Sequence, residues 1–279
     1  MGRYGGLARQ GRSRERTICR PSASSEFDLY TRGDATALRE ARSGVPGQYC
    51  RLARVWRSGA TKRGLVAEVL SAFLNWFLSD VVPPPHAVVA AGHAASYALY
   101  QAVYRPGTIN RLVLIAPTWR GPLPTMMGGQ RPWFARIRAA VDLPGLGPLL
   151  DRLNVSKLVV ARMAREHVYD DRSWLSGDLL AAKLAVTRAP GARHASVRFV
   201  SGGLDRVESR AAFLDLAQRV NVPILVVFGD QTPARSCAEI EALADLPNVH
   251  AKRLTEGKLA IHEEFTEAVA GLVIPFLSA

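Results

Sequence analysis

The side chains that could do chemistry lie in loops that follow short, strand-like apolar stretches. His93, Asp230 and His262 stand in three such loops, and a fourth loop, 117–127, combines apolar and basic residues. A histidine can act as a general base, and a carboxylate can orient it. A lone histidine is more often a cap or a surface residue, so these positions do not by themselves establish an active site.

Three residues of the loop 117–127 could contact a ligand. Trp119 and Met126 could form an apolar wall for an acyl, isoprenoid or pigment-like molecule. Arg120 could pair with a carboxylate or a phosphate. In an equally good interpretation, Trp119 and the methionines anchor the loop to the rest of the protein and Arg120 is solvated. His93 could either pack internally or line the same cleft as a substrate-binding residue.

The sequence predicts neither a metal site nor a cofactor. No two histidines stand three or four residues apart, and no carboxylate cluster accompanies any of them. No phosphate-binding glycine loop follows a strand-like stretch. The cysteines, Cys19, Cys50 and Cys237, are odd in number and far apart, which is typical of a reducing compartment. No apolar run is long enough for a transmembrane segment.

Strand-like and helical stretches alternate from about residue 61 onward. Near-continuous apolar strands, each followed by a helix, indicate a mostly parallel sheet covered on both faces. Right-handed crossovers make this a doubly wound α/β domain, which binds ligands at the carboxyl ends of its strands. Residues 117–200 carry mixed helical signals without a clear strand. We expect strands at 87–91, 111–116, 223–228 and 249–254, and helices at 65–78, 95–104, 209–220, 234–244 and 263–277.

The order of these elements over 65–279 resembles the C-terminal two-thirds of an α/β-hydrolase. The resemblance implies a helical lid, at about 117–200, inserted after the strand at 111–116, and an ester or acyl hydrolase activity. More narrowly, the sequence is similar to a cyanobacterial and plastid family of α/β-hydrolase-fold proteins. The segments that carry the resemblance are AAGHAASYALYQ (90–101), RLVLIAPTWRGPLPTMMG (111–128), HVYDD (167–171), GGLDRVESR (202–210), VPILVVFGDQTPARSCAEIEALADLPNV (222–249) and GKLAIHEEF (257–265).

The resemblance breaks at the nucleophile. The family motif Gly-x-Ser-x-Gly lifts a serine on a sharp turn. Here Gly92 matches the first glycine, and Ala94 stands at the nucleophile position. Alanine has no nucleophilic atom. Ser96 fills the last small-residue slot, where its hydroxyl more readily supports the backbone. The chain also has no His-Gly pair to complete an oxyanion hole.

The acid of the family's catalytic triad is replaced as well. The resemblance puts it three residues after Gly229, at Thr232. Asp230, two residues early, is a weak candidate acid, and Asp205, near the end of the insertion, is a weak alternative. Both are better explained as turn or cap residues. His262 stands where the family has its catalytic histidine, which makes it the candidate base.

Two functions follow from these residues. The first is a catalytically impaired α/β-hydrolase-fold protein that binds a small or lipid-like molecule, or a protein partner, in its cleft. The second is a working hydrolase or lyase in which His262 acts as general base on water, oriented by Asp230 or Asp205. A third possibility is that the beginning of the chain is incomplete and no full domain forms. The sequence does not identify a substrate, a partner or an oligomeric state.

The N-terminal segment 1–60 is basic and shows no clear periodicity. It holds 12 arginines and 5 acidic residues, a net of +7 of the chain's +12. Residues 1–25, rich in Arg and Ser, are typical of an organellar transit peptide and predict a chloroplast location, with the cytoplasm as the alternative. Because interleaved aromatic residues are lacking, we expect no nucleic-acid binding. We therefore expect 61–279 to form the α/β domain.

Overall fold

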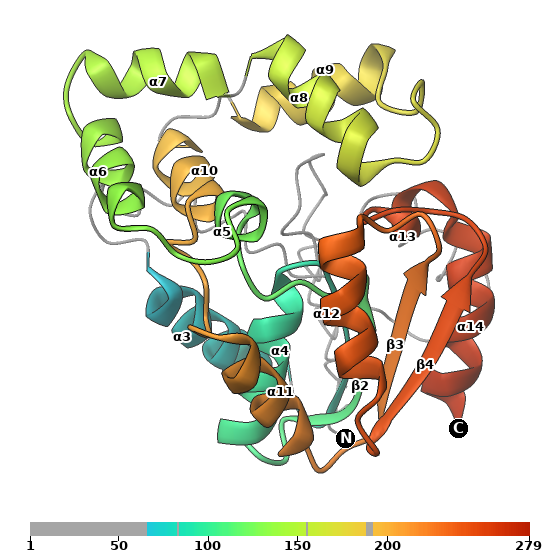
Figure 1. The fold of residues 1–279 in the computed structure, drawn as a ribbon. Coiled ribbons are helices and arrows are strands. Elements are labelled where there is room, and N and C mark those ends of the chain that lie inside the picture. The colour runs from blue at the N-terminus through green and yellow to red at the C-terminus, as the bar shows by residue number, and fades with distance from the viewer. Residues whose placement is uncertain (1–65, 83, 155, 188–191) are drawn as a thin grey trace, which may run out of the picture.

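The computed structural model describes residues 66–82, 84–154, 156–187 and 192–279. The predictions for 1–60, including the transit peptide, lie outside these residues and stay predictions. Within the described chain, parallel strands form a sheet in the order β1-β2-β3-β4 (Figure 1). The strands are His86–Ala91 (β1), Ile109–Ile115 (β2), Ile224–Gly229 (β3) and Val249–Leu254 (β4).

The alternation of side chains gives the sheet two apolar faces. Leu112 and Leu114 of β2 lie in the main core, whereas Val113 and Ile115 lie in a second core on the opposite face. Every residue of β3 is buried. Burial on both faces explains why these strands are continuous apolar runs in the sequence rather than alternating ones. The four predicted strands are confirmed, and β2 begins two residues earlier than predicted.

Helices pack on both faces of the sheet, which confirms the doubly wound arrangement. Helices α3, α4, α11 and α12 contribute to the main core, and α13 and α14 cover the other face (Figure 1). Among the described residues, no helix combines the length and the apolar character needed to cross a membrane. The bounds are Ala67–Trp76 (α3), Ala94–Tyr104 (α4), Arg210–Gln218 (α11), Ala234–Ala244 (α12), Ile261–Glu264 (α13) and Thr266–Ser278 (α14).

Two helices differ from their prediction by more than a shift of one or two residues at an end. The first ends at Trp76 and continues as a π-helical turn, Phe77–Val81 (η1). The terminal helix, predicted as one element over 263–277, is instead the two helices α13 and α14. Phe265 separates them because its backbone, at φ −117° and ψ 47°, is not helical. The period of the apolar residues continues across this break, so the sequence pattern alone did not reveal it.

A helical insertion between β2 and β3 lies at the carboxyl end of the sheet (Figure 1). The loop after β4 contacts it directly, since the Ala260 N–H donates to the Val168 carbonyl oxygen at 3.0 Å. The helical character predicted for 117–200 is therefore present, while a role as a lid stays a prediction. The insertion contains Pro122–Met126 (α5), Pro132–Val141 (α6), Leu146–Asn154 (α7), Lys157–Met163 (α8), Ala164–Val168 (η2), Gly177–Thr187 (α9) and Ala192–Val200 (α10).

Candidate functional site

The turn between β1 and α4 is where the resemblance places the nucleophile. Gly92 has a φ of 55°, in the left-handed region that glycine enters without a steric penalty. Its N–H donates to the Ile115 carbonyl oxygen at 2.9 Å. Ala94 is not the left-handed residue of this turn, because it is already the first residue of α4. The Ser96 hydroxyl donates to the His93 carbonyl oxygen at 3.0 Å, so it supports the backbone.

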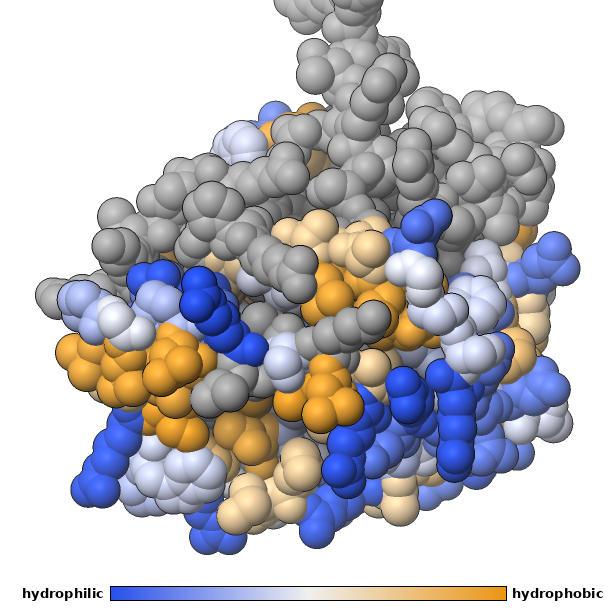
Figure 2. Space-filling view, turned by 90° about the horizontal axis from the view of Figure 1, so that it is seen from above, coloured by the Kyte–Doolittle hydropathy of each residue, from blue (hydrophilic) through white to orange (hydrophobic). Residues whose placement is uncertain are grey.

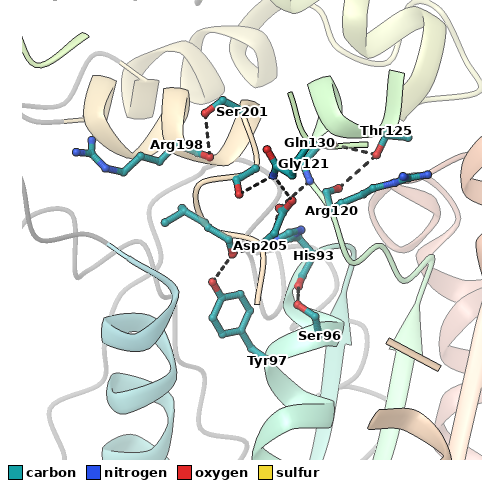
Figure 3. Close-up of polar contacts among 12 residues, drawn as sticks. His93, Ser96, Tyr97, Arg120, Gly121, Thr125, Gln130, Arg198, Ser201 and Asp205 are labelled. Carbon is teal, nitrogen blue, oxygen red and sulfur yellow. Dashed lines mark hydrogen bonds and ion pairs between the residues drawn. The ribbon is translucent and has the colours of Figure 1, made fainter. Parts of the chain in front are cut away.

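His93 points into the protein (Figure 3). Its imidazole is fully buried, and Nε2 lies 3.1 Å from the Leu204 carbonyl oxygen. The Tyr97 hydroxyl donates to the same oxygen at 2.5 Å. Burial lowers the pKa of His93 to about 4, so the ring is neutral at neutral pH and Nε2 donates its proton to Leu204. His93 therefore joins α4 to the segment after α10.

Asp205 lies beside His93 and joins the two ends of the insertion (Figure 3). Its Oδ1 accepts the Gly121 N–H at 2.8 Å, and its Oδ2 accepts from the Gln130 amide at 3.2 Å. The same Oδ1 is 3.6 Å from His93 Nε2. Burial raises the pKa of Asp205 to about 7, although the Gly121 hydrogen bond acts to lower it. Because the imidazole is neutral at neutral pH, the contact with His93 is not a permanent ion pair.

Of the three residues of the loop 117–127 expected to contact a ligand, two have other partners and the third is exposed. Trp119 is buried in the main core, where its ring stacks with Phe213 at a centroid distance of 6.4 Å. Arg120 forms an ion pair with Glu239 at 3.2 Å and lies over the Trp119 ring. Met126 is 52% exposed at the end of α5. Trp119 thus matches the anchoring interpretation, and Arg120 is paired rather than solvated.

The polar residues after β3 do not supply a free carboxylate at the position of the catalytic acid. Asp230 is exposed and forms an ion pair with Arg253 of the neighbouring strand β4. Thr232 is buried, and its hydroxyl has no hydrogen-bond partner among the described residues. The carboxylate nearest the acid position in the sequence is therefore held by an arginine, and the residue at that position carries no charge.

His262 lies in the short helix α13, partly buried. Its Nδ1 is buried and makes no hydrogen bond within the described chain. Among the contacts of the described residues, none joins His262 to Asp230 or Asp205. The structure therefore does not bring the candidate base and the candidate acids together.

The two glutamates that follow His262 connect helix α13 to the insertion by hydrogen bonds. Glu263 accepts from the Tyr169 hydroxyl at 2.5 Å and from the Lys183 ammonium at 2.9 Å. Although burial opposes it, Lys183 and His262 together lower the pKa of Glu263. The Glu264 carboxylate accepts the backbone N–H groups of residues 170 and 171. The sequence segments 167–171 and 257–265 are thus two sides of one structural contact.

An apolar pocket of about 410 Å³ lies inside the insertion. Small-molecule pockets commonly have volumes of roughly 300–1,000 Å³. Arg136, whose side chain is exposed, stands at its edge, and Leu123 of α5 also lines it. Its aliphatic walls are Ile137, Ala140 and Val141 of α6, Leu150 of α7, and Val197 and Val200 of α10.

The sequence patterns described above did not predict this pocket. Ile137, Ala140 and Val141 have the i, i+3, i+4 spacing of a buried helix face, which was the available signal. The helix that completes the pocket, α10, lies more than fifty residues further along the chain, so no local pattern joins it to α6. Among the described residues, no group of His, Cys, Asp or Glu side chains is placed to hold a metal ion.

The sheet order, the sharp turn after β1 and the insertion after β2 define the α/β-hydrolase fold, and solved structures agree. VinJ aligns with a TM-score of 0.57 and 17% identity over 88% of this chain and 84% of its own. A bromoperoxidase from Bacillus anthracis aligns at 0.56 and 14% identity over 88% and 86%. The enol-lactonase from Burkholderia xenovorans LB400 aligns at 0.56 and 16% identity over 77% and 74%. No family model and no curated protein sequence matches.

The chain therefore has the α/β-hydrolase fold. Likenesses this distant establish the fold alone, because one fold supports many functions. The function has to be argued from the residues of the turn after β1, the loops after β3 and β4, and the pocket in the insertion.

Proposed function

We propose that this α/β-hydrolase-fold protein lacks nucleophilic catalysis and binds a lipid-like molecule. The observation that carries the proposal is the turn between β1 and α4. In the fold, the nucleophile stands on this sharp turn, and here the left-handed residue is Gly92, two residues before Ala94. We therefore place the vacant nucleophile position at Gly92. Neither residue offers a nucleophilic atom.

The loops after β3 and β4 support the same proposal. Orienting an imidazole by charge requires a carboxylate within hydrogen-bond reach of it. Thr232 carries no charge, and Asp230 is engaged by Arg253. His93 is the histidine of the turn itself, but its Nε2 proton is donated to the Leu204 carbonyl oxygen. Its low pKa makes it a poor base at neutral pH.

The ligand site that we propose is the pocket of the insertion rather than the cleft at the strand ends. Trp119 and Arg120, the residues expected to form that cleft, are packed and paired. The pocket instead offers aliphatic walls from three helices, with Arg136 at its edge. This composition suits an aliphatic chain that ends in an acidic group, because a guanidinium pairs with a carboxylate or phosphate.

Binding of the fluorescent fatty acid cis-parinaric acid tests this site. Ala140 lines the pocket, and its neighbour Ala139 is exposed on the same helix. We expect Ala140→Trp to weaken binding by at least about tenfold, since the indole occupies the pocket, while Ala139→Trp binds like the natural protein. Circular dichroism would verify that both variants fold. Equal binding by the two variants, or no binding by the natural protein, would reject the site.

A second function, hydrolysis or lyase chemistry with His262 as general base, is favoured by one observation. Its Nδ1 is buried without a hydrogen-bond partner in the described chain, as a base awaiting a substrate would be. The carboxylates that would orient it are engaged elsewhere, Asp230 by Arg253 and Asp205 by the Gly121 N–H. If a panel of esters reveals turnover, its loss in His262→Gln would favour this second function.

A further inference from the structure

The insertion exposes large apolar side chains on its outer surface. Leu158 is 80% exposed, Leu149 55% and Leu143 51%. Figure 2, which views the molecule from above the insertion, shows apolar side chains gathered in patches beside hydrophilic ones. Contiguous exposed apolar surface marks interaction sites more often than chance. We call this surface the insertion face and define it by Trp133, Leu143, Leu146, Leu149, Leu158 and Val159.

On α7 the apolar residues form a stripe that ends in an arginine. Leu146 and Leu149 are three residues apart, so they lie on one side of the helix. Arg152 follows at the next step of three and is exposed as well. Leu150 lines the pocket, so α7 presents one apolar surface inward and a second one outward.

The same sequence of side chains recurs on α8 and η2. Arg162 stands one turn after Leu158, and Arg165 stands almost one turn further on. All three side chains are exposed. Each helix thus presents a leucine toward solvent with an arginine beside it, an arrangement typical of helices that lie in the interface of a membrane.

We propose that the insertion face docks on a lipid bilayer that contains anionic lipids. The leucines would enter the boundary between headgroups and acyl chains. The aliphatic stems of the arginines would lie along the apolar surface while their guanidinium groups reach the lipid phosphates. This inference does not depend on whether the pocket binds a ligand, because the leucines that it rests on lie outside the pocket.

The charges of the insertion face favour an anionic bilayer over a protein partner or a second copy. Of the charged side chains described in 132–168, four arginines are exposed but only one carboxylate, Glu166. That carboxylate is itself paired with Arg162 at 2.8 Å. A second copy of this chain would bring arginines against arginines, whereas anionic lipids attract each arginine near the surface. The exposed arginines are Arg136, Arg152, Arg162 and Arg165.

Flotation of the full chain with vesicles tests the proposal. Vesicles of phosphatidylcholine alone would be compared with vesicles that also contain phosphatidylglycerol. The variant Leu149→Glu/Leu158→Glu places charges on the insertion face. Val69→Glu/Val81→Glu is the matched control, because both residues are exposed large apolar side chains outside the insertion. All four positions are exposed, so the folded state should tolerate the changes.

We expect the natural chain and the control to float with anionic vesicles, and added salt to weaken the binding. The insertion-face variant should bind at least about tenfold more weakly, because two leucines lose their burial in the membrane. Equal flotation of the two variants, or no flotation of the natural chain, would overturn the proposal. So would light scattering that shows a dimer broken by Leu149→Glu/Leu158→Glu, since a second copy would then cover the face.

Discussion

Replacing Asp205 with asparagine should change how the stability of the protein depends on pH. Asp205 has an ordinary pKa of 3.8 and a folded-state pKa of about 7, because it is buried. Between these values the folded state holds a proton that the unfolded state has lost. The carboxyl group therefore contributes stability that is complete below pH 3.8 and is lost as the pH rises through 7.

His93 acts in the opposite direction. Its pKa is 6.5 in the unfolded chain and about 4 in the folded one. Between these values the unfolded state holds the extra proton, so stability falls as the pH drops from 6.5 to 4. At about 1.36 kcal/mol per pH unit, the two contributions are about 4 kcal/mol for Asp205 and about 3 kcal/mol for His93. In the natural protein they largely offset each other between pH 4 and 6.5.

Urea unfolding of matched variants separates the two contributions. Relative to the natural protein, Asp205→Asn should gain about 4 kcal/mol in the free energy of unfolding between pH 4 and pH 7. His93→Gln, whose amide can still donate to Leu204, should gain about 3 kcal/mol relative to the natural protein as the pH falls from 6.5 to 4. Subtracting the free energy of unfolding of the natural protein from that of a variant at the same pH cancels the contributions of all other titratable groups.

A lasting ion pair between His93 and Asp205 would remove both effects. The carboxylate pKa would then lie below 3.8 and the imidazole pKa above 6.5, so both groups would be charged in the folded and the unfolded state throughout these windows, and neither difference would change with pH there. A difference that rises with pH for Asp205→Asn supports a neutral, structural contact. A difference that stays constant between pH 4 and pH 6.5 for both variants would refute it and would restore His93 and Asp205 as a charged pair near the turn.

Three further changes probe the contacts that hold the fold together. Glu264→Ala removes the acceptor of the N–H groups of residues 170 and 171. Hydrogen exchange of these two amides should become faster, which corresponds to a free energy of opening that is lower by about 1–3 kcal/mol. Unchanged exchange would show that the contact is absent in solution. Gly229→Ala would put a Cβ against the carbonyl oxygens of residues 256 and 257, so we expect a loss of about 1–3 kcal/mol in urea unfolding; no loss would mean that this loop moves aside freely. Leu114→Ala, at a fully buried position of β2, should cost about 2–5 kcal/mol; a cost below 1 kcal/mol would contradict the packing of the main core.

The central strands β2 and β3 were predictable from the sequence because they are largely buried on both faces. An apolar run such as 224–228 has few alternatives once a helix follows it. Strand β4 is mostly exposed and has no such run, so its prediction depended on its place after the helix at 234–244. The break at Phe265 was not predictable, because it interrupts the backbone of the terminal helix without interrupting its apolar pattern. Helix content in the insertion was visible, but the way its helices pack was not.

The candidate site was predicted only in part, for a different reason. The sequence alone shows that Gly92 and Ala94 carry no nucleophilic atom. The partners of the site residues were not, because they come from distant parts of the chain. His93 meets the Leu204 carbonyl oxygen 111 residues away, and Glu263 meets Tyr169 94 residues away. A residue type suggests what a side chain can do, and only the fold decides which partner it meets.

Reaction with a serine-directed fluorophosphonate, run beside turnover of short- and medium-chain p-nitrophenyl esters, tests whether the protein lacks nucleophilic catalysis. An active serine hydrolase would serve as the positive control for both reagents. Because neither Gly92 nor Ala94 carries a nucleophilic atom, we predict that the purified natural protein is not labelled and does not raise ester hydrolysis above the solvent rate. Stoichiometric labelling, or turnover at an ordinary enzymic rate of about 1 s⁻¹ or more, would show that the protein has a working nucleophile.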